Sequence, residues 1–180
     1  STLSGTEPCE VVLEGCRVPG DQVLGGVGKG WALNQAWLGS KRVLYGIRCH
    51  GMARRLLRVA QASLRENPSE LEKCSPRLGS LSIELDGLRL LTYYGAWKAD
   101  QGLDVRIEAA SVKLVGSELV HRVVDFALDV LGPAAYHKTH LVARLFRSAR
   151  ATRIYEGASE IQRHIIQRAL YRDGTTSDLM

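Results

Sequence analysis

The sequence lacks any long apolar run and any recognisable secretion signal. No stretch approaches the roughly 18 consecutive apolar residues that a transmembrane helix requires, and residues 1–6 are polar rather than basic and then apolar. These absences argue against a membrane span and favour a cytoplasmic protein, or one of the mitochondrial matrix if the source is eukaryotic. An initiator methionine is also missing. The chain is therefore expected to be either a fragment or a processed form of a longer protein, and its first residues do not distinguish the two.

Cysteine is scarce, and so are patterns that bind metals. The four cysteines, Cys9, Cys16, Cys49 and Cys74, form no C-x-x-C pair and are too few to hold together a chain of 180 residues. They are expected to be free thiols in a reducing compartment. His137 and His140 have no third ligand of matching spacing nearby, so we predict no metal site and expect surface or helix-capping histidines.

The excess of positive charge is small. Lys and Arg number 24 against 19 Asp and Glu, a net charge of +5 that suits acidic partners such as nucleotides without choosing among them. Arg54, Arg55 and Arg58 cluster without interleaved aromatic residues, so they predict a solvated face, with phosphate contact as the alternative, and no nucleic-acid partner. The glycine-rich residues 25–30 lack the G-x-x-x-x-G-K-S/T spacing of a phosphate loop and are read as a connector.

The first thirty residues differ from all that follow. Residues 10–13 and 16–19 flank a Glu14-Gly15 turn signal, which predicts two short strands. An isolated hairpin is marginal in water, so this segment should be the end of a β domain that the chain mostly does not contain. We therefore assign residues 1–28 to the end of that domain and its connecting loop, and residues 29–180 to a helical domain.

The remaining chain predicts five helices. Residues 31–67 contain no proline and carry apolar residues at helical spacing, which indicates one long helix. Further helices are expected at 76–100, after a loop at 70–75, then from a cap at Asp104 to Gly132-Pro133, at 141–150 and at 159–171. The third carries its inner face on Val112, Val115, Leu119, Val123, Phe126 and Val130. The predicted fold is mainly α, an antiparallel up-down four-helix bundle plus a C-terminal helix, preceded by a short β segment.

Two local features add detail to this fold. Gly46 and Gly51 lie inside the first helix, where each costs about 1 kcal/mol relative to alanine, so a close helix crossing or ligand approach is expected there. Ser159 and Gln162 form a capping-box pattern before the last helix, which puts Glu156 in the preceding loop. From spacing alone, Glu156 is either a solvated loop acid or a functional residue.

The segment at 154–163, IYEGASEIQR, resembles the C-terminal signature of the flavin-dependent acyl-CoA dehydrogenases. Residues 10–25, 28–42 and 129–132 resemble further stretches of the same family, in the same order. The resemblance covers essentially the whole chain. It implies the last strands of the family's middle β domain followed by its C-terminal helical bundle.

The resemblance also implies an activity and a site. Members oxidise an acyl-CoA thioester to a 2-enoyl-CoA with FAD, while a carboxylate removes the α proton, and Glu156 occupies the position of that catalytic base. An α proton of a thioester is weakly acidic, so the base must be close and desolvated. Some members carry the base on the first long helix, where this chain has Lys41, which favours Glu156. Substrate contacts are implied for Ser40, Lys41, Arg42, Tyr155 and Gly157. Arg42 is equally compatible with an interior ion pair.

FAD contacts are implied for a further set of residues: Asp129, Gly132, Ala158, Ser159 and Glu160. The chain departs from the family here, because Asp129 replaces a glutamine, Pro133 replaces a glycine, and residues 70–75 lack the family's Arg-x-Phe-Gly loop. Proline offers no N–H, and aspartate carries the wrong charge to lie near a diphosphate. These departures put FAD contacts between subunits in question.

Three functions remain open on the sequence. The first is an acyl-CoA dehydrogenase that forms a homo- or hetero-oligomer, dimer or tetramer, and passes electrons to an electron-transferring flavoprotein or a similar acceptor. The second is a non-catalytic or half-site partner subunit in a hetero-oligomer. The third is an unrelated helical binding module. Alone, these 180 residues are not expected to turn over substrate.

Overall fold

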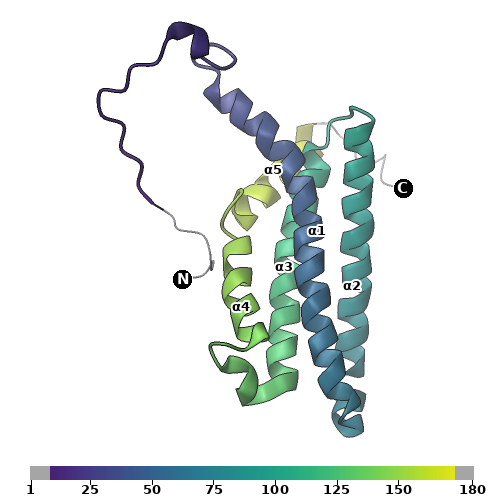
Figure 1. The fold of residues 1–180 in the computed structure, drawn as a ribbon. Coiled ribbons are helices and arrows are strands. Elements are labelled where there is room, and N and C mark those ends of the chain that lie inside the picture. Colours follow the sequence, from purple (N-terminus) through teal and green to yellow (C-terminus); the bar gives the residue numbers. More distant parts are fainter. Residues whose placement is uncertain (1–8, 173–180) are drawn as a thin grey trace.

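The structure is a computed structural model that describes residues 9–172, except for the side chains of Ser40 and Arg172. Its elements are η1 (Gly20–Gln22), α1 (Gly30–Arg65), α2 (Pro68–Asp100), α3 (Arg106–Leu131), η2 (Gly132–Tyr136), α4 (Leu141–Thr152) and α5 (Ser159–Arg172). Helices α1 to α4 alternate in direction, and α5 lies across the end of the bundle (Figure 1). Helix α3 is central, since it packs against α1, α2, α4 and α5. The predicted helical bundle with its additional C-terminal helix is confirmed.

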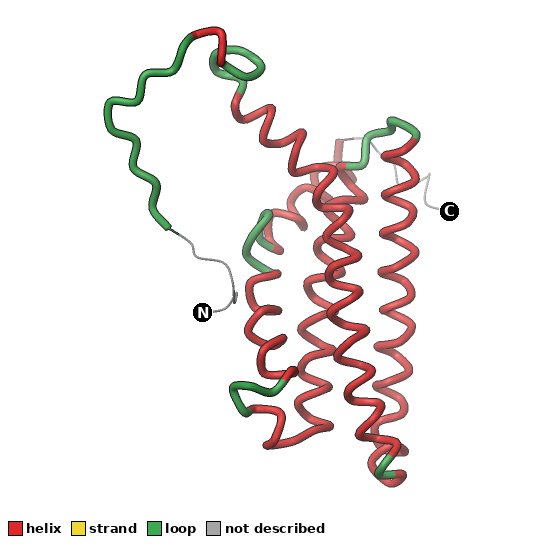
Figure 2. The backbone as a smooth tube through the Cα atoms, viewed as in Figure 1, coloured by secondary structure: helices red, strands yellow, loops and turns green. Residues whose placement is uncertain are grey.

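The two short strands expected at 10–13 and 16–19 do not form. Residues 9–28 are irregular apart from η1, and no strand occurs within the described range 9–172 (Figure 2). Strands need partner strands for their backbone hydrogen bonds, and nothing in the described chain supplies them. The segment and the first turns of α1 extend away from the bundle (Figure 1), which leaves Trp31 exposed.

Helix α2 begins earlier than expected, so the predicted loop at 70–75 is wrong. The Asn67 side chain accepts a hydrogen bond from the Glu70 N–H, and Pro68 occupies the first helical position, where its missing N–H costs nothing. Pro76 lies inside the helix at an exposed position. The strong start at Asn67-Pro68 therefore outweighs the proline eight residues later.

The other helix ends follow the sequence signals closely. The Asp104 carboxylate accepts from the Arg106 N–H at the start of α3. Gly132 ends α3 with a φ of 63°, and His140 caps α4 by accepting from the Val142 N–H. The expected capping role of a histidine is thus confirmed, and the described residues hold no group of metal-binding side chains. Val115, expected on the inner face of α3, is instead 38% exposed.

Gly46 allows α1 to pack tightly into the bundle. A Cβ atom there would collide with Thr92 Oγ1 on α2 and with Val112 Cγ1 on α3. Gly116 on α3 supports the same approach, because its Cβ would lie 3.0 Å from the Cys49 Cβ. The predicted close crossing is confirmed at Gly46 but is wrong at Gly51, which faces open space.

Helix length, cysteine state and arginine exposure can each be compared with the expectations from the sequence. No helix within residues 9–172 combines the length and apolar character needed to cross a bilayer. All four cysteines are free thiols, as expected, with Cys49 buried and Cys9 and Cys16 exposed. The arginines at 54, 55 and 58 are exposed on α1, which agrees with a solvated face.

Candidate active site around Glu156

Glu156 lies in the loop that joins α4 to α5, in a conformation that side chains rarely adopt. Its φ is 58°, the only positive value for a non-glycine residue in the described chain, and Gly157 follows with a φ of 95°. A non-glycine residue in this region costs about 1–3 kcal/mol, so the surrounding structure must hold it there. Such strain is concentrated at functional sites, and it singles out Glu156 without reference to any sequence motif.

Two side chains hold the backbone of this loop. Arg42 on α1 donates from Nε to the Glu156 carbonyl oxygen at 3.0 Å. Gln162 on α5 donates from Nε2 to the carbonyl oxygens of Gly157, at 3.0 Å, and of Glu156, at 3.3 Å. Both donors bind the main chain, so the Glu156 carboxylate remains free of them. A Cβ at Gly157 would lie 2.5 Å from Gln162 Nε2, which is why a glycine is needed there.

A pair of tyrosines ties the same loop to α1. The Tyr45 hydroxyl donates to the Tyr155 hydroxyl at 2.8 Å, and the two rings meet edge to face with centroids 5.5 Å apart. Burial raises the pKa of Tyr45, so its hydroxyl stays protonated and can donate. Helix α1 thus positions the loop through Arg42 and Tyr45, which are three residues apart and lie on one helical face.

The Glu156 side chain lines a pocket against α1. The pocket has a volume of about 190 Å³ and is lined by Lys41, Leu44, Tyr45, Arg48 and Glu156. Glu156 is half-buried, and its Oε2 atom is buried with no hydrogen-bond partner. Buried carboxylate oxygens are nearly always hydrogen-bonded, so an open one in a pocket is available to take a proton from a bound molecule.

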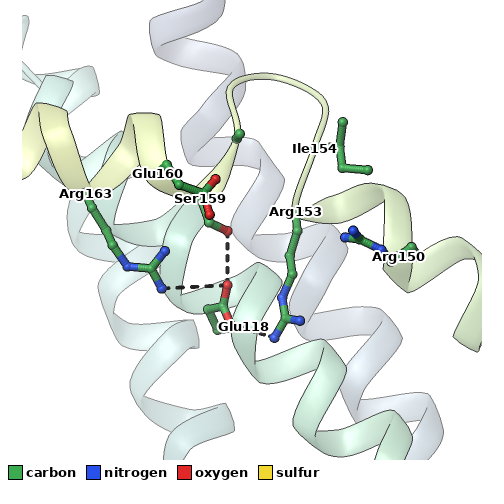
Figure 3. Close-up of a pocket in the computed structure, with 8 residues that line it drawn as sticks. Glu118, Arg150, Arg153, Ile154, Ser159, Glu160 and Arg163 are labelled. Atoms are coloured by element: carbon green, nitrogen blue, oxygen red, sulfur yellow. Dashed lines mark hydrogen bonds and ion pairs between the residues drawn. The ribbon is translucent and has the colours of Figure 1, made fainter.

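A second, larger pocket lies where the same loop meets α3, α4 and α5. It has a volume of about 450 Å³ and is lined by Glu118, Arg150, Arg153, Ile154, Ala158, Ser159, Glu160 and Arg163 (Figure 3). Glu118 Oε2 accepts from Arg153 at 2.6 Å, and Oε1 accepts from Ser159 Oγ at 3.0 Å. Three arginines around one half-buried acid, at the N-terminus of α5, make this pocket suitable for an anionic group.

The charge of Glu118 is well supported within this pocket. Burial acts to raise its pKa, but the hydrogen bonds from Ser159 and Arg153 and their positive surroundings outweigh burial, and the pKa of Glu118 is lowered. Glu118 is therefore ionised at neutral pH and holds Arg153 by an ion pair. Arg163 on α5 lies 4.0 Å from the same carboxylate.

The structure brings together most of the predicted site residues. Lys41 and Glu156 line the same pocket, Tyr155 and Gly157 flank Glu156 in the loop, and Arg42 binds that loop. Ser40 lies in α1, but its side chain is outside what the structure describes. Arg42 is buried and binds a backbone carbonyl rather than a carboxylate, so the interior ion pair considered for it is not what the described chain shows. Contact with CoA remains a prediction.

The predicted flavin contacts fall into two separate groups. Ala158, Ser159 and Glu160 line the arginine-rich pocket beside Glu118. Asp129 lies about 16 Å further along α3 by helical rise and forms an ion pair with Arg77, at 2.6 Å, with Gly132 just beyond it. The two groups therefore lie at different levels of the bundle.

The predicted capping box at α5 is wrong in its contacts. Ser159 Oγ binds Glu118 instead of the Gln162 N–H, and the Gln162 side chain reaches the carbonyls of the loop. Tertiary partners on α3 and in the loop replaced the local capping bonds. Gln162 is thus a site residue that the sequence misassigned. Arg48, at helical spacing from Lys41 on α1, was missed although that spacing could have revealed it.

Lys113 is a charged residue buried beneath the site without compensation. Its side chain is 0% exposed, and its Nζ has no hydrogen-bond partner. Burial lowers the pKa of Lys113, an effect that the nearby Cys49 thiol opposes. Burial also raises the pKa of Cys49 to about 12, with Lys113 acting against it, so this thiol is neutral at physiological pH.

Replacing Lys113 by methionine should stabilise the chain by about 1–2 kcal/mol at pH 7, because an apolar side chain of similar length avoids burying an unpaired amine. The unfolded lysine binds protons up to its ordinary pKa of 10.5, whereas the folded one releases its proton at lower pH. The stability of the parent should therefore rise with pH between the lowered pKa of folded Lys113 and 10.5. The difference in stability between Lys113→Met and the parent should shrink over the same range.

Urea unfolding of both proteins at pH 7 and pH 10 measures this effect. Lys138→Met, at an exposed position, serves as the matched control and should change stability by less than about 0.5 kcal/mol. A destabilised Lys113→Met protein would show that the buried amine has a stabilising partner.

Comparison with known proteins shows which family contains this chain. Residues 28–171 match the family model described as "Acyl-CoA dehydrogenase, C-terminal domain". The chain belongs to this family. This chain is 36% identical over 173 residues to (R)-benzylsuccinyl-CoA dehydrogenase of Thauera aromatica, an alignment that covers 92% of this chain and 43% of that protein.

Two other similarities agree. (2S)-Methylsuccinyl-CoA dehydrogenase of Cereibacter sphaeroides is 30% identical over 173 residues, covering 92% of this chain and 32% of that protein. The solved structure of butyryl-CoA dehydrogenase from Megasphaera elsdenii superimposes with a TM-score of 0.81 and 28% identity, over 86% of this chain and 42% of that one. The chain thus spans less than half the length of these relatives.

The acyl-CoA dehydrogenase family uses a flavin, and the chain fits one in part. The arginine-lined pocket beside Ala158 suits an anionic dinucleotide, because Arg153 has a buried Nε without a hydrogen-bond partner. At the end of α3, Asp129 presents an acid, which Arg77 already neutralises. The first group of residues therefore fits a flavin nucleotide, while the second offers no free cation for a diphosphate.

Proposed function

We propose that the protein containing this domain oxidises an acyl-CoA thioester to the corresponding 2-enoyl-CoA, with Glu156 as the base that removes the α proton. FAD, when bound, would accept the hydride from the β carbon. The observation that carries this proposal is the Glu156 carboxylate: its Oε2 atom is buried and has no hydrogen-bond partner, and the residue lines a pocket. Such a group can accept a proton without first breaking an internal bond.

The surrounding residues support this role by fixing the base. Arg42 and Gln162 bind the loop through its carbonyl oxygens, which leaves the carboxylate to the substrate. The left-handed conformation of Glu156 is maintained by these contacts rather than by local preference. A base held in advance loses little conformational freedom when substrate binds, and this raises the rate of proton transfer.

Two relatives carry names that bear on the acyl group of the substrate. The enzymes from Thauera aromatica and Cereibacter sphaeroides are named for benzylsuccinyl-CoA and methylsuccinyl-CoA, both of which are thioesters of a dicarboxylic acid. We propose a substrate within the wider class of acyl-CoA thioesters, an electron-transferring flavoprotein or similar acceptor, and a location in the cytoplasm or mitochondrial matrix. We also propose that the protein forms an oligomer of two or four chains.

The test is a spectrum of the full-length protein. We expect bound flavin in a ratio of one per chain, and we expect its absorbance to be bleached when an acyl-CoA thioester is added without oxygen. The product, identified by mass, should be two hydrogen atoms lighter than the substrate. Flavin that no acyl-CoA bleaches would contradict the proposed reaction.

The Asp129–Arg77 ion pair favours one second candidate, a half-site subunit in a hetero-oligomer. In that case a partner chain would supply the flavin contacts that Asp129 and Pro133 do not provide. The flavin content distinguishes the two candidates, because a half-site arrangement gives one flavin for every two chains. One flavin per chain in a homogeneous oligomer would exclude it.

A further inference from the structure

We infer that the acyl group of the substrate carries a second, free carboxylate, and that Arg48 and Lys41 bind it beside Glu156. This inference rests on the proposed function and names its substrate class. It concerns the pocket of about 190 Å³ lined by Lys41, Leu44, Tyr45, Arg48 and Glu156. The four residues from α1 are spaced by three, four and seven positions, so one helical face presents two cations to the base.

Neither cation has an acid partner within the described chain. Other basic residues form ion pairs within 4 Å, among them Arg77, Lys98, Arg122 and Arg153, whereas none is formed by Lys41 or Arg48 in residues 9–172. Each instead lies against an aromatic ring. Lys41 Nζ is 3.7 Å from the centroid of the Trp37 ring, and the Arg48 guanidinium is 5.8 Å from that of Tyr155.

The ring contacts orient these side chains without neutralising them. An aromatic ring carries no net charge, so a cation over its face keeps its full charge and can still pair with a carboxylate. The pocket therefore holds two positive charges against the single negative charge of Glu156, with net charge +1. One further carboxylate would balance it, and a planar guanidinium can bind that group through two parallel hydrogen bonds.

The position of the base indicates where on the acyl chain this carboxylate lies. Arg42 and Tyr45 contact the loop at Glu156 and Tyr155, so the base lies at their level along α1. Lys41 and Arg48 are each within about one helical turn, roughly 5 Å of rise, of that level. A carboxylate two or three carbons from the thioester carbonyl, as in succinyl or glutaryl groups, would reach them while its α carbon faces Glu156.

The phosphates of CoA are a poorer match for these two cations. A pantetheine arm separates the thioester from the phosphates, so cations that share a pocket with the α-carbon base address the acyl end of the substrate. A neutral acyl group would leave the net positive charge of the pocket uncompensated. The same pocket contains Leu44, which can contact the methylene groups between the two carboxyl carbons.

The experiment compares acyl-CoA pairs of equal carbon number on the full-length flavoprotein. Rates of flavin reduction are measured with glutaryl-CoA against pentanoyl-CoA, and with succinyl-CoA against butanoyl-CoA. We expect at least one carboxylated thioester to be preferred by tenfold or more in kcat/KM. Arg48→Gln should lower that preference by about 10- to 100-fold, Lys41→Gln should also lower it, and Arg48→Lys should retain part of it.

Two further measurements make the outcome decisive. Arg58→Gln, which removes an exposed arginine of the same helix outside the pocket, should keep the parent preference. Dissociation constants of glutaryl-CoA and pentanoyl-CoA, measured in a Glu156→Gln background without turnover, should show the same dependence on Arg48. Equal or better use of neutral thioesters by the parent, or a preference that survives both Gln substitutions, overturns the inference while the proposed function stands. If no thioester reduces the bound flavin, both the inference and the proposed function are wrong.

Discussion

Replacing Glu156 by glutamine should slow the reduction of bound flavin by acyl-CoA by about 10²- to 10⁴-fold, the usual contribution of a general base. Glutamine has nearly the same shape, but its amide cannot take a proton from the α carbon at neutral pH. The effect should fall on the chemical step, which single-turnover absorbance measurements isolate from substrate binding. No other substitution considered for this protein should reduce the rate as much.

The structure indicates that Glu156→Gln removes the base without disturbing the loop. The loop is held through the Glu156 carbonyl oxygen, which Arg42 and Gln162 bind, so losing the carboxylate breaks neither contact. Flavin content and thermal stability should therefore match those of the parent. Glu156→Asp keeps the acid but withdraws it by one methylene group, so it should retain a larger share of the rate than glutamine does.

Glu72→Gln provides the matched control, because it removes an exposed carboxylate from α2, far along the sequence from the pocket. It should reduce flavin at the parent rate. If Glu156→Gln is reduced as fast as the control, another group is the base. Lys41, which occupies the alternative position of the base in some family members, would then be the first residue to examine.

The helical bundle could be predicted because its signals are local. Apolar residues at helical spacing, the cap at Asp104 and the glycine at 132 each act within a few residues, and the observed helices begin and end near them. The start of α2 was missed for a physical reason. Two prolines, Pro68 and Pro76, offered competing signals, and only the capping bond at Asn67 decides which of them begins the helix.

The sequence could locate the candidate site, but it could not predict which distant residues contact it. A motif placed Glu156 before the last helix, and the structure shows there a strained residue with an open carboxylate. The residues that hold it come from elsewhere: Arg42 is 114 positions away from Glu156, and Tyr45 is 110 away from Tyr155. No local pattern reports such contacts. They depend on how closely α1 approaches α3, and therefore on Gly46.

Replacing Gly46 by alanine should destabilise the chain by about 3 kcal/mol or more, beyond the usual cost of overpacking a core. The added Cβ would collide with Thr92 and Val112, neither of which can move aside. Thr92 is buried, and its hydroxyl is bonded to the Leu88 carbonyl at 2.7 Å, while Val112 is completely buried on the central helix. Helix α1 would have to shift as a whole. We expect a drop in Tm of about 6–12 °C, measured by circular dichroism.

Gly51 supplies the control within the same helix. Nothing lies within 4 Å of the Cβ that Gly51→Ala would add, so the only effect expected is the better helix propensity of alanine, a gain of up to about 1 kcal/mol. Replacing glycine by alanine should thus lower the stability at position 46 and raise it at position 51. Because Gly46 lies between Arg42 and Arg48, a shift of α1 there would also displace the groups that hold and face Glu156. Gly46→Ala should therefore slow flavin reduction even below its Tm, whereas Gly51→Ala should not. Equal stability of the two variants would show that α1 can yield at the crossing, and that the position of Glu156 does not depend on it.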